Sequence, residues 1–415
     1  MSIPPVPVAL LRRATLADGR LADVVLDGDR VAEVLPGGTA ASPAGGGETL
    51  ELDGFLLLTA PADPHSHLDK ARSWDAIRPP MGDLETAIRS WHRYAETMTA
   101  DDVAERARAQ VLAMVAKGTT AIRSHVDVLL GDAPTRGVEA LVRVREELRG
   151  LVDIEIVALA GWEATDAALE AVLDAGADAV GGAPHLAPDP IADLRRIVAV
   201  AERRGLPIDL HTDESLAGQT TLGEYARLVA GWERNASAGH CVRLGAMPAA
   251  ERDLLVAAVV AARIGVIANP ITNLYLQGWG VDVATPRGLA PARQLLDAGA
   301  RFAAGADNVR DPFNPLGRSD ALETAMLLVA AAHLTVDEAY AAVSDGAREV
   351  MGLPAAGPVP GAAAELLAVR AGSLVEAVAE APADRIVVHA GRLVARTVSE
   401  THLAAPAALS PTGTR

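Results

Sequence analysis

The middle of the chain, residues 56–352, alternates short apolar runs with alanine-rich segments whose apolar residues recur at helical spacing. This pattern predicts an α/β fold, because each strand-like run is followed by a helix that can lead to the next parallel strand. We expect eight strands, within residues 55–67, 119–125, 154–159, 179–181, 208–211, 237–240, 266–269 and 302–307. Eight units in roughly 300 residues match a (β/α)₈ TIM-type barrel with insertions. A doubly wound open sheet is the alternative, but no Gly-rich phosphate fingerprint follows any strand.

The two ends of the chain show short apolar runs that alternate with turn residues. The segments ADVVLDGDRV at 22–31 and DRIVVHAGRLV at 384–394 both have the form of a β-hairpin. Residues 37–47 are rich in Gly, Ala, Ser and Pro, which predicts a loop. We therefore predict two domains. Residues 1–55 and 353–415 form a small β-sandwich module, and residues 56–352 form the barrel inserted between them.

Composition narrows the classes of function. A net charge of −17 argues against binding nucleic acid or anionic membranes, because no excess of cations can displace phosphate counterions. No apolar run approaches the length of a membrane span, and the first residues lack the regions of a signal peptide, so we expect a cytoplasmic protein with a small-molecule ligand. Cys241 is the only cysteine, which excludes an internal disulfide and every cysteine-based zinc signature. Homo-oligomers are common among such barrels, but the sequence carries no specific interface signal.

Polar residues that can bind a metal follow several predicted strands. His65 and His67 are two residues apart on the first strand, so both side chains face the same side. Such a pair alone is weak evidence, but His211, His240 and Asp307 each end another strand. In a barrel these strand ends meet at one rim, where catalytic groups collect. Two histidines of the first strand, one of the fifth and an aspartate of the eighth could bind Zn²⁺ or Fe²⁺ and leave a position for water.

Seven segments carry a resemblance to a known family along nearly the whole chain. They are, in order, PHSHLDK at 64–70, RSHVDV at 123–128, GGAPH at 181–185, HTDES at 211–215, SAGH at 237–240, ANPITNLYLQG at 268–278 and GADNVRDPFNPLG at 305–317. Together they resemble the amidohydrolase superfamily, and within it the branch of bacterial cytosine deaminase and N-isopropylammelide hydrolase.

The resemblance assigns roles to individual residues. It implies that the metal ligands are His65, His67, His211 and Asp307. It also implies that Glu214 shuttles protons between water, ring nitrogen and leaving amine, while His240 polarises or orients the nucleophile. The chemistry independently needs such a carboxylate, because ammonia leaves poorly as an anion.

The resemblance also bears on the number of metal ions. Some relatives hold two metals bridged by a carboxylated lysine on the fourth strand. The only lysines here are Lys70, after the first strand, and Lys117, before the second. We therefore expect one divalent ion, Zn²⁺ or Fe²⁺.

Other positions depart from the cytosine deaminase pattern. Gly161 stands where those enzymes have a glutamine that binds the pyrimidine edge, which removes a donor and an acceptor and opens space. Trp162 could refill that space as a stacking wall or pack in the barrel core. Asn308 and Lys70 both look like the N-isopropylammelide hydrolase, which lacks the equivalent of Glu214. Asn308 can donate to a ring carbonyl, and Lys70 could meet an oxygen of the substrate or form a salt bridge with Asp69 or Asp127.

The remaining candidates for the pocket come from the last loops. Phe313 falls where the deaminases have a tryptophan over the substrate, so it stacks on a planar ring or packs in the core. Gln277 and Asn273, after the seventh strand, could line the pocket. His125 ends the second strand and could reach the rim, and we expect the other histidines to be structural or exposed: His92, His185, His333, His389 and His402.

Three functions are compatible with these residues. The first is metal-dependent hydrolytic deamination of an amino-substituted nitrogen heterocycle, such as an aminopyrimidine or aminotriazine, with Asp307 and His240 handling the proton of the hydroxide. The second uses the same groups to release a substituted amine or to open a cyclic amide. The third is a non-catalytic barrel scaffold, which the complete ligand set argues against.

Overall fold

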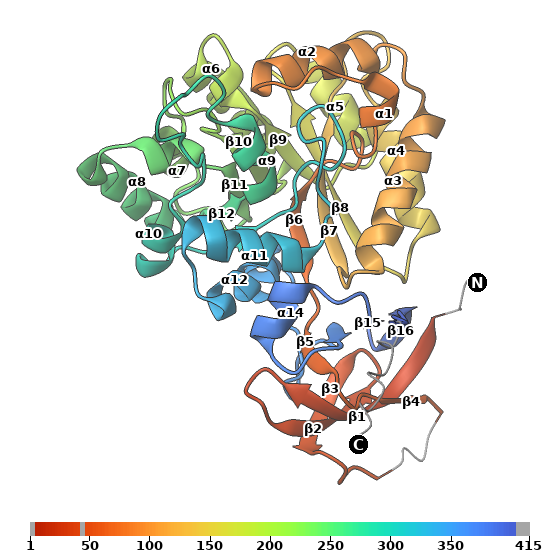
Figure 1. Ribbon diagram of the computed structural model, residues 1–415. Helices are drawn as coiled ribbons and strands as arrows, with labels where there is room; N and C mark the ends of the chain where they lie inside the picture. The colour runs from red at the N-terminus through yellow and green to blue at the C-terminus, as the bar shows by residue number, and fades with distance from the viewer. Residues whose placement is uncertain (1–4, 42–45, 404–415) are drawn as a thin grey trace, which may run out of the picture.

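The barrel is present as predicted. The computed structural model describes residues 5–41 and 46–403; the parts of the predicted terminal module and loop at 1–4, 42–45 and 404–415 lie outside it. A sheet of eight parallel strands follows the order of the chain (Figure 1). Its strands are β6 (Ala62–Ser66), β7 (Ala121–Asp127), β8 (Asp153–Ala160), β9 (Ala179–Gly182), β10 (Ile208–Thr212), β11 (Ala236–His240), β12 (Gly265–Ala268) and β13 (Phe302–Ala304). An isolated parallel bridge between Ser66 and Asp307 links the first and last strands.

Helices flank this sheet, and all of them except the short first one at residues 74–77 contribute buried residues. They are α1 (Trp74–Ile77), α2 (Leu84–Ala95), α3 (Ala100–Val115), α4 (Arg136–Glu147), α5 (Asp166–Asp174), α6 (Pro190–Arg204), α7 (Leu222–Leu228), α8 (Ala249–Ala261), α9 (Pro270–Leu276), α10 (Ala292–Asp297), α11 (Ala321–Ala332), α12 (Val336–Val343), α13 (Asp345–Met351) and α14 (Leu374–Glu380). The sequence encodes their ends. For α6, the Asp189 side chain accepts from the Ala192 N–H, Pro190 stands in the first turn, and Gly205 ends the helix at φ +66°.

The two ends of the chain pair into a separate mixed sheet, the terminal sheet. Its strands are β1 (Val6–Leu16), β2 (Leu21–Asp27), β3 (Arg30–Pro36), β4 (Glu48–Glu51), β5 (Leu56–Thr59), β14 (Leu366–Val369), β15 (Arg385–His389) and β16 (Arg392–Thr397). Strand β1 pairs with β2, β4, β5 and β16, so N-terminal and C-terminal strands share one apolar core. In the view of Figure 1 this sheet lies below the barrel, with α2 at the opposite end.

The first predicted strand, residues 55–67, is in fact two strands in different sheets. Residues 56–59 form β5, which pairs with β1 and β14 in the terminal sheet, and the barrel begins at Ala62. The predicted domain boundary counted 56–59 with the barrel, whereas their pairing is with the terminal sheet. The run FLLLTA is apolar except for Thr59, so its pattern carries no clear sign of a change of sheet. Pro61, which lacks an N–H, marks the break.

Among the described residues, no helix combines the length and the apolar character that crossing a membrane requires.

Candidate active site

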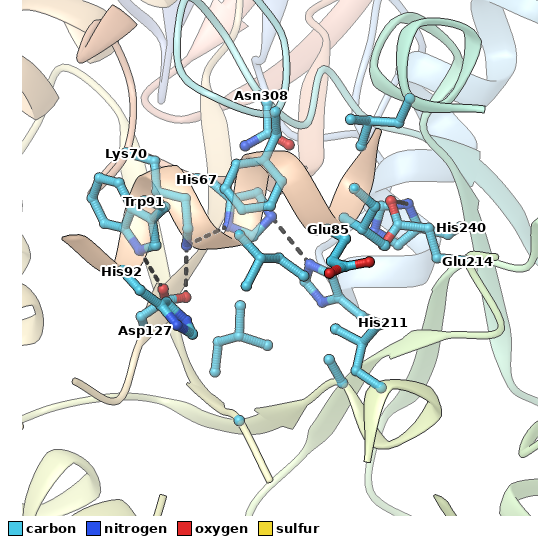
Figure 2. Close-up of a pocket in the computed structure, with 18 of the residues that line it drawn as sticks. His67, Lys70, Glu85, Trp91, His92, Asp127, His211, Glu214, His240 and Asn308 are labelled. Atoms are coloured by element: carbon cyan, nitrogen blue, oxygen red, sulfur yellow. Dashed lines mark hydrogen bonds and ion pairs between the residues drawn. The ribbon is translucent and has the colours of Figure 1, made fainter. Parts of the chain in front are cut away.

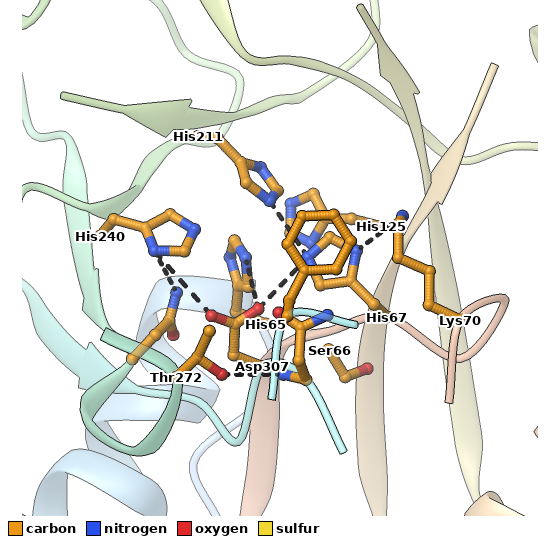
Figure 3. Close-up of polar contacts among 12 residues, drawn as sticks. His65, Ser66, His67, Lys70, His125, His211, His240, Thr272 and Asp307 are labelled. Atoms are coloured by element: carbon orange, nitrogen blue, oxygen red, sulfur yellow. Dashed lines mark hydrogen bonds and ion pairs between the residues drawn. The ribbon is translucent and has the colours of Figure 1, made fainter. Parts of the chain in front are cut away.

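Four of the predicted metal ligands converge at the carboxyl ends of the barrel strands. His67 Nε2 lies 3.1 Å from His211 Nε2 and 3.3 Å from Asp307 Oδ1, and His65 Nε2 lies 3.8 Å from the same oxygen (Figure 3). Two ligand atoms that are each about 2.1 Å from one ion in a tetrahedral arrangement are about 3.4 Å apart. The spacing of these side chains therefore fits one shared cation.

The hydrogen bonding of these groups also fits a cation. Both ring nitrogens of His65, Nδ1 of His211 and both carboxylate oxygens of Asp307 are buried and have no hydrogen-bond partner among the described residues. Buried polar atoms are almost always hydrogen-bonded, so a cluster of unpartnered lone pairs calls for an electron-pair acceptor. Burial lowers the pKa of His65, His67 and His211 far below the usual range, and the neighbouring histidines add to this. The imidazoles are therefore neutral, which is the form that binds a metal.

The backbone holds the ends of the strands in unusual conformations. His240 and Asp307 have φ angles of +69° and +56°, in the left-handed region that non-glycine residues rarely adopt. The Asp307 N–H donates to the His65 carbonyl at 2.8 Å, and the buried Asp63 carboxylate accepts from the N–H groups of His65 and Ala306. These bonds join the first and last strands at the point where their ligands meet. Strained conformations of this kind persist only where the surroundings enforce them, and they cluster at functional sites.

Glu214 lies beside this cluster and is also buried. Its Oε1 is 3.4 Å from His240 Nδ1 and accepts from Asn273 Nδ2 at 3.4 Å. Burial raises the pKa of Glu214 to about 8, so the carboxyl carries a proton at neutral pH. Gln277 Nε2 donates to the Glu214 carbonyl at 2.9 Å, which ties the loop after β12 to the end of β10. With its raised pKa, Glu214 is placed as a group that can donate a proton next to the side chains that could hold a metal.

One cavity of about 690 Å³ opens above these groups and is lined by six residues that the sequence suggested for substrate binding, whereas Asn273, also suggested, does not line it. His67, His211, Glu214, His240 and Asp307 line it together, and Figure 2 shows the first four. Its walls include the six predicted positions Lys70, Gly161, Trp162, Gln277, Asn308 and Phe313. The cavity thus brings proton-transfer groups and candidate substrate contacts together in one space.

Three of these wall residues answer alternatives that the sequence left open. Lys70 Nζ is 2.6 Å from Asp127 Oδ1 and 3.4 Å from Asp69 Oδ2, so it forms the alternative salt bridges and also lines the cavity. The Trp162 side chain is 47% exposed at the cavity mouth and is not a core residue. A Cβ at Gly161 would meet no atom within 4 Å, so this position is open space.

The other two wall residues have structural contacts of their own. Asn308 Nδ2 donates to Asp311 Oδ2 at 2.8 Å. This bond does not use the amide oxygen of Asn308. Phe313 is half-buried, packs against the barrel core and lines the cavity. Phe313 therefore contacts the barrel core on one side and the cavity on the other, so neither expected position is excluded.

The sequence did not reveal the contribution of α2. This helix places Ile88, Trp91 and His92 on the cavity wall, and Trp91 Nε1 donates to Asp127 Oδ2 at 2.7 Å (Figure 2). His92 was expected to be structural or exposed. The amphipathic pattern of α2 is equally typical of an ordinary barrel helix, so the sequence holds no sign that it is an insertion over the active site.

Two other histidines do not line the cavity. His125 does not line the cavity but lies beneath the metal cluster, with its ring centroid 4.1 Å from that of His65. It precedes the end of β7 by two residues, so it faces inward one layer below Asp127. His185, expected to be structural or exposed, is buried behind Glu214, and its Nδ1 donates to the His211 carbonyl at 3.1 Å.

Comparisons with known proteins agree with this arrangement. The chain matches the amidohydrolase family over residues 93–402. It is 31% identical over 395 residues to the pterin deaminase of Rhizobium rhizogenes, covering 91% of this chain and 89% of that protein.

Two solved structures extend the comparison to the fold. The N-isopropylammelide isopropylaminohydrolase of Burkholderia multivorans is 31% identical, with a TM-score of 0.80 over 94% of this chain and 98% of that one. The 5-methylcytosine deaminase of Klebsiella pneumoniae, solved with 5-fluorocytosine, is 25% identical, with a TM-score of 0.84 over 95% and 99%. With its barrel, its buried histidine and aspartate cluster and these relatives, the chain belongs to the amidohydrolase family and is a hydrolase that acts on C–N bonds.

Proposed function

We propose that this protein is a metal-dependent deaminase of an amino-substituted nitrogen heterocycle. One observation carries the proposal: buried Glu214, whose pKa is raised to about 8 by burial, lies 3.4 Å from His240 in the cavity that three of the four proposed metal ligands also line. A deaminase needs such a group, because the departing nitrogen must leave as neutral ammonia. The deaminases among the relatives support the same reaction class.

We assign one divalent ion, Zn²⁺ or Fe²⁺, to His65, His67, His211 and Asp307. Bound there, such an ion supplies Lewis acidity and lowers the pKa of a water molecule towards neutrality. The positions of the two lysines agree with a single ion, because a second ion would need a carboxylated lysine on the fourth barrel strand. Lys70 is bound to Asp127, and Lys117 donates to the Arg318 carbonyl, so neither reaches β9, the fourth barrel strand.

The protein's own side chains then move the protons. Asp307 and His240 accept the proton of the attacking water; His240 Nδ1 lies 3.9 Å from Asp307 Oδ2, so the two can share it. Glu214 donates its proton to the ring nitrogen. The proton that His240 took from the water then passes to the Glu214 carboxylate, 3.4 Å away, which delivers it to the amine. Ammonia leaves as the second proton of the water returns through His240 to Glu214, which restores the starting state. His240 stays neutral before the reaction because burial lowers its pKa to about 3.

The walls of the cavity indicate the class of substrate. Trp162 and Phe313 offer apolar surfaces to a planar ring, and Lys70 and Asn308 offer donors to a ring oxygen. The open space at Gly161 admits a ring larger than cytosine. We therefore propose an oxygen-bearing aminopyrimidine, free or fused to a second ring as in a pterin, or an aminotriazine.

The test is ammonia release by the metal-loaded protein over a panel of aminopyrimidines, aminotriazines, purines and pterins. The variant Glu214→Gln keeps the shape of the site but cannot deliver a proton, so we expect activity to fall by about 10²–10⁴-fold. Glu163→Gln is the matched control, because Glu163 also lines the cavity but lies at its exposed mouth. Undiminished activity in Glu214→Gln would remove Glu214 from this role.

A second candidate is release of an alkylamine, or opening of a cyclic amide, by the same groups. The structural relative from Burkholderia multivorans and the donors Lys70 and Asn308 favour it. Product analysis separates the two reactions: free ammonia supports deamination, whereas an alkylamine or a ring-opened acid supports the second candidate. A protein that holds no metal and gains no activity when metal is added would instead be a scaffold.

A further inference from the structure

His65 has the least hydrogen bonding of the four proposed ligands. Its ring is fully buried, and neither nitrogen has a hydrogen-bond partner among the described residues. Its Nε2 faces Asp307. The opposite edge of the ring packs against β11, where a Cβ at Gly239 would lie 2.8 Å from His65 Nδ1 and 2.6 Å from Cε1. The ring is therefore held sterically, but its second nitrogen still needs an acceptor.

That need follows from the chemistry of a neutral imidazole. If Nε2 presents its lone pair to a cation, the proton of the ring is on Nδ1. A ligating histidine usually donates this N–H to a carboxylate or carbonyl, which fixes the tautomer and the orientation of the ring. Loss of such an outer partner typically weakens metal binding by about 10–100-fold.

His125 and Asp209 are buried polar groups close to the ring of His65. The rings of His65 and His125 are 4.1 Å apart between centroids and inclined by 33° (Figure 3). His125 Nε2 is 3.5 Å from Asp209 Oδ1. One nitrogen of His65, one of His125 and a carboxylate oxygen of Asp209 all lie within 4.8 Å of one another. Both nitrogens of His125 and Oδ1 of Asp209 are otherwise without a partner among the described residues.

Asp209 is held in this position from the other side. Arg123 Nη1 donates to Asp209 Oδ2 at 2.8 Å, which leaves Oδ1 directed at the histidines. Arg123 itself is held by Glu155 at 2.8 Å. A guanidinium already pairs with this carboxylate, so a second cation beside Asp209 would be repelled. His125 and Asp209 are therefore better suited to orient His65 than to hold a second metal together with it.

We propose that His125 and Asp209 are positioning residues for His65, with the imidazole of His125 fixing the plane of the ring and the carboxylate of Asp209 fixing its tautomer. The inference rests on the proposed metal site. It predicts that metal affinity depends on two residues that do not line the cavity.

The test measures the affinity for Zn²⁺ by competition with a chromophoric chelator, together with the absorption spectrum of the Co²⁺-loaded protein. His125→Phe keeps a planar ring beside His65 but removes its nitrogens, and Asp209→Asn keeps a hydrogen-bonding group for Arg123. We expect each to weaken Zn²⁺ binding by about 10–100-fold and to change the Co²⁺ spectrum. Glu155→Gln is the matched control, because it alters the same Arg123 network without approaching His65, and we expect its affinity to stay within about threefold of wild type.

The outcomes are distinguishable. Folding of each variant is checked by its thermal transition in the metal-free state, so a loss of affinity is counted only for folded protein. Wild-type affinity in both His125→Phe and Asp209→Asn would overturn the inference alone, as would an equal loss in Glu155→Gln. A wild-type protein that binds neither Zn²⁺ nor Co²⁺ would overturn the proposed function, and the inference with it.

Discussion

Two layers of buried polar side chains lie inside the barrel. The charged side chains of the deeper layer have partners within the protein, whereas Asp307, at the carboxyl ends of the strands, has none among the described residues. In the deeper layer, Arg123 donates to Glu155, Asp209 and Ser237, and every one of these bonds joins two strands. Burial raises the pKa of Asp209, but His125 and Arg123 outweigh this and hold it below the usual value. At the carboxyl ends, Asp307 has no such partner, and burial raises its pKa well above the usual value.

This difference separates structural polar residues from functional ones. A buried charge that serves the fold has its partner inside the protein, because an unpaired charge would be strongly unfavourable there. A buried group left without a partner destabilises the protein until something binds it. The four predictions below test this contrast in order of expected effect.

The largest effect should come from Asp307→Asn. We expect turnover of the best substrate to fall by at least about 10³-fold, because the change removes an anionic ligand and a proton acceptor together. The measurement is the initial rate at saturating metal.

The same variant should behave differently in stability. Without metal, Asp307→Asn should be at least as stable as wild type in urea unfolding, because the change removes a buried acid whose ionised form is unfavourable there and puts a neutral amide of similar size in its place. A clear loss of metal-free stability would contradict the contrast between the two layers.

Next is Arg123→Met in the deeper layer. Removing the guanidinium leaves Asp209 and Glu155 without their partner, so we expect the free energy of unfolding to fall by about 3–5 kcal/mol. Urea unfolding measures it. The control Arg149→Met removes an exposed ion pair with Glu146 and should leave the unfolding midpoint unchanged. Equal stability of both variants would show that the Arg123 network does not support the fold.

Gly239→Ala should have a smaller effect, confined to the proposed metal ligands at the carboxyl ends of the strands. The added Cβ would lie 2.6 Å from Cε1 of His65, so the ring must shift away from the other ligands. We expect Zn²⁺ affinity to fall by at least about tenfold with the fold retained. Chelator competition measures the affinity, and Gly46→Ala is the control, because Gly46 is exposed and an added Cβ there would meet no atom within 4 Å.

The smallest effect concerns the terminal sheet, where His389 Nδ1 pairs with Glu365 Oε2 at 2.9 Å. Burial lowers the pKa of His389, but Glu365 outweighs this and raises it above 6.5. Burial likewise raises the pKa of Glu365, but His389 outweighs this and holds it below 4.5. The histidine's contribution is therefore full below pH 6.5 and is lost as the pH rises through its raised pKa. The contribution of Glu365 is full above pH 4.5 and is lost as the pH falls.

The pair should therefore stabilise the protein most between these two values. We expect His389→Gln to lower the free energy of unfolding by about 1–2 kcal/mol near pH 5.5 and by much less near pH 9. Urea unfolding at the two pH values measures it. A difference that does not depend on pH would show that the role of His389 is packing alone.

Sequence alone determined the barrel and the identity of the residues at its carboxyl ends. Strand period, helix caps and the spacing of His65 and His67 are local properties, so they can be read along the chain. Because parallel strands end at one rim, the same reasoning brought His211, His240 and Asp307 to one place, whereas Glu214 was identified by the resemblance to the amidohydrolases.

Tertiary structure alone decided what surrounds those residues. The change of sheet between β5 and β6, the position of Trp91 over the cavity and the depth of His125 beneath His65 all depend on contacts between distant segments. No periodic pattern distinguishes an apolar strand in one sheet from its continuation in another, or a helix beside the barrel from one above it. Hydrogen-bond partners are likewise set by the packed fold, so only the structure shows that Asp209 is paired and Asp307 is not.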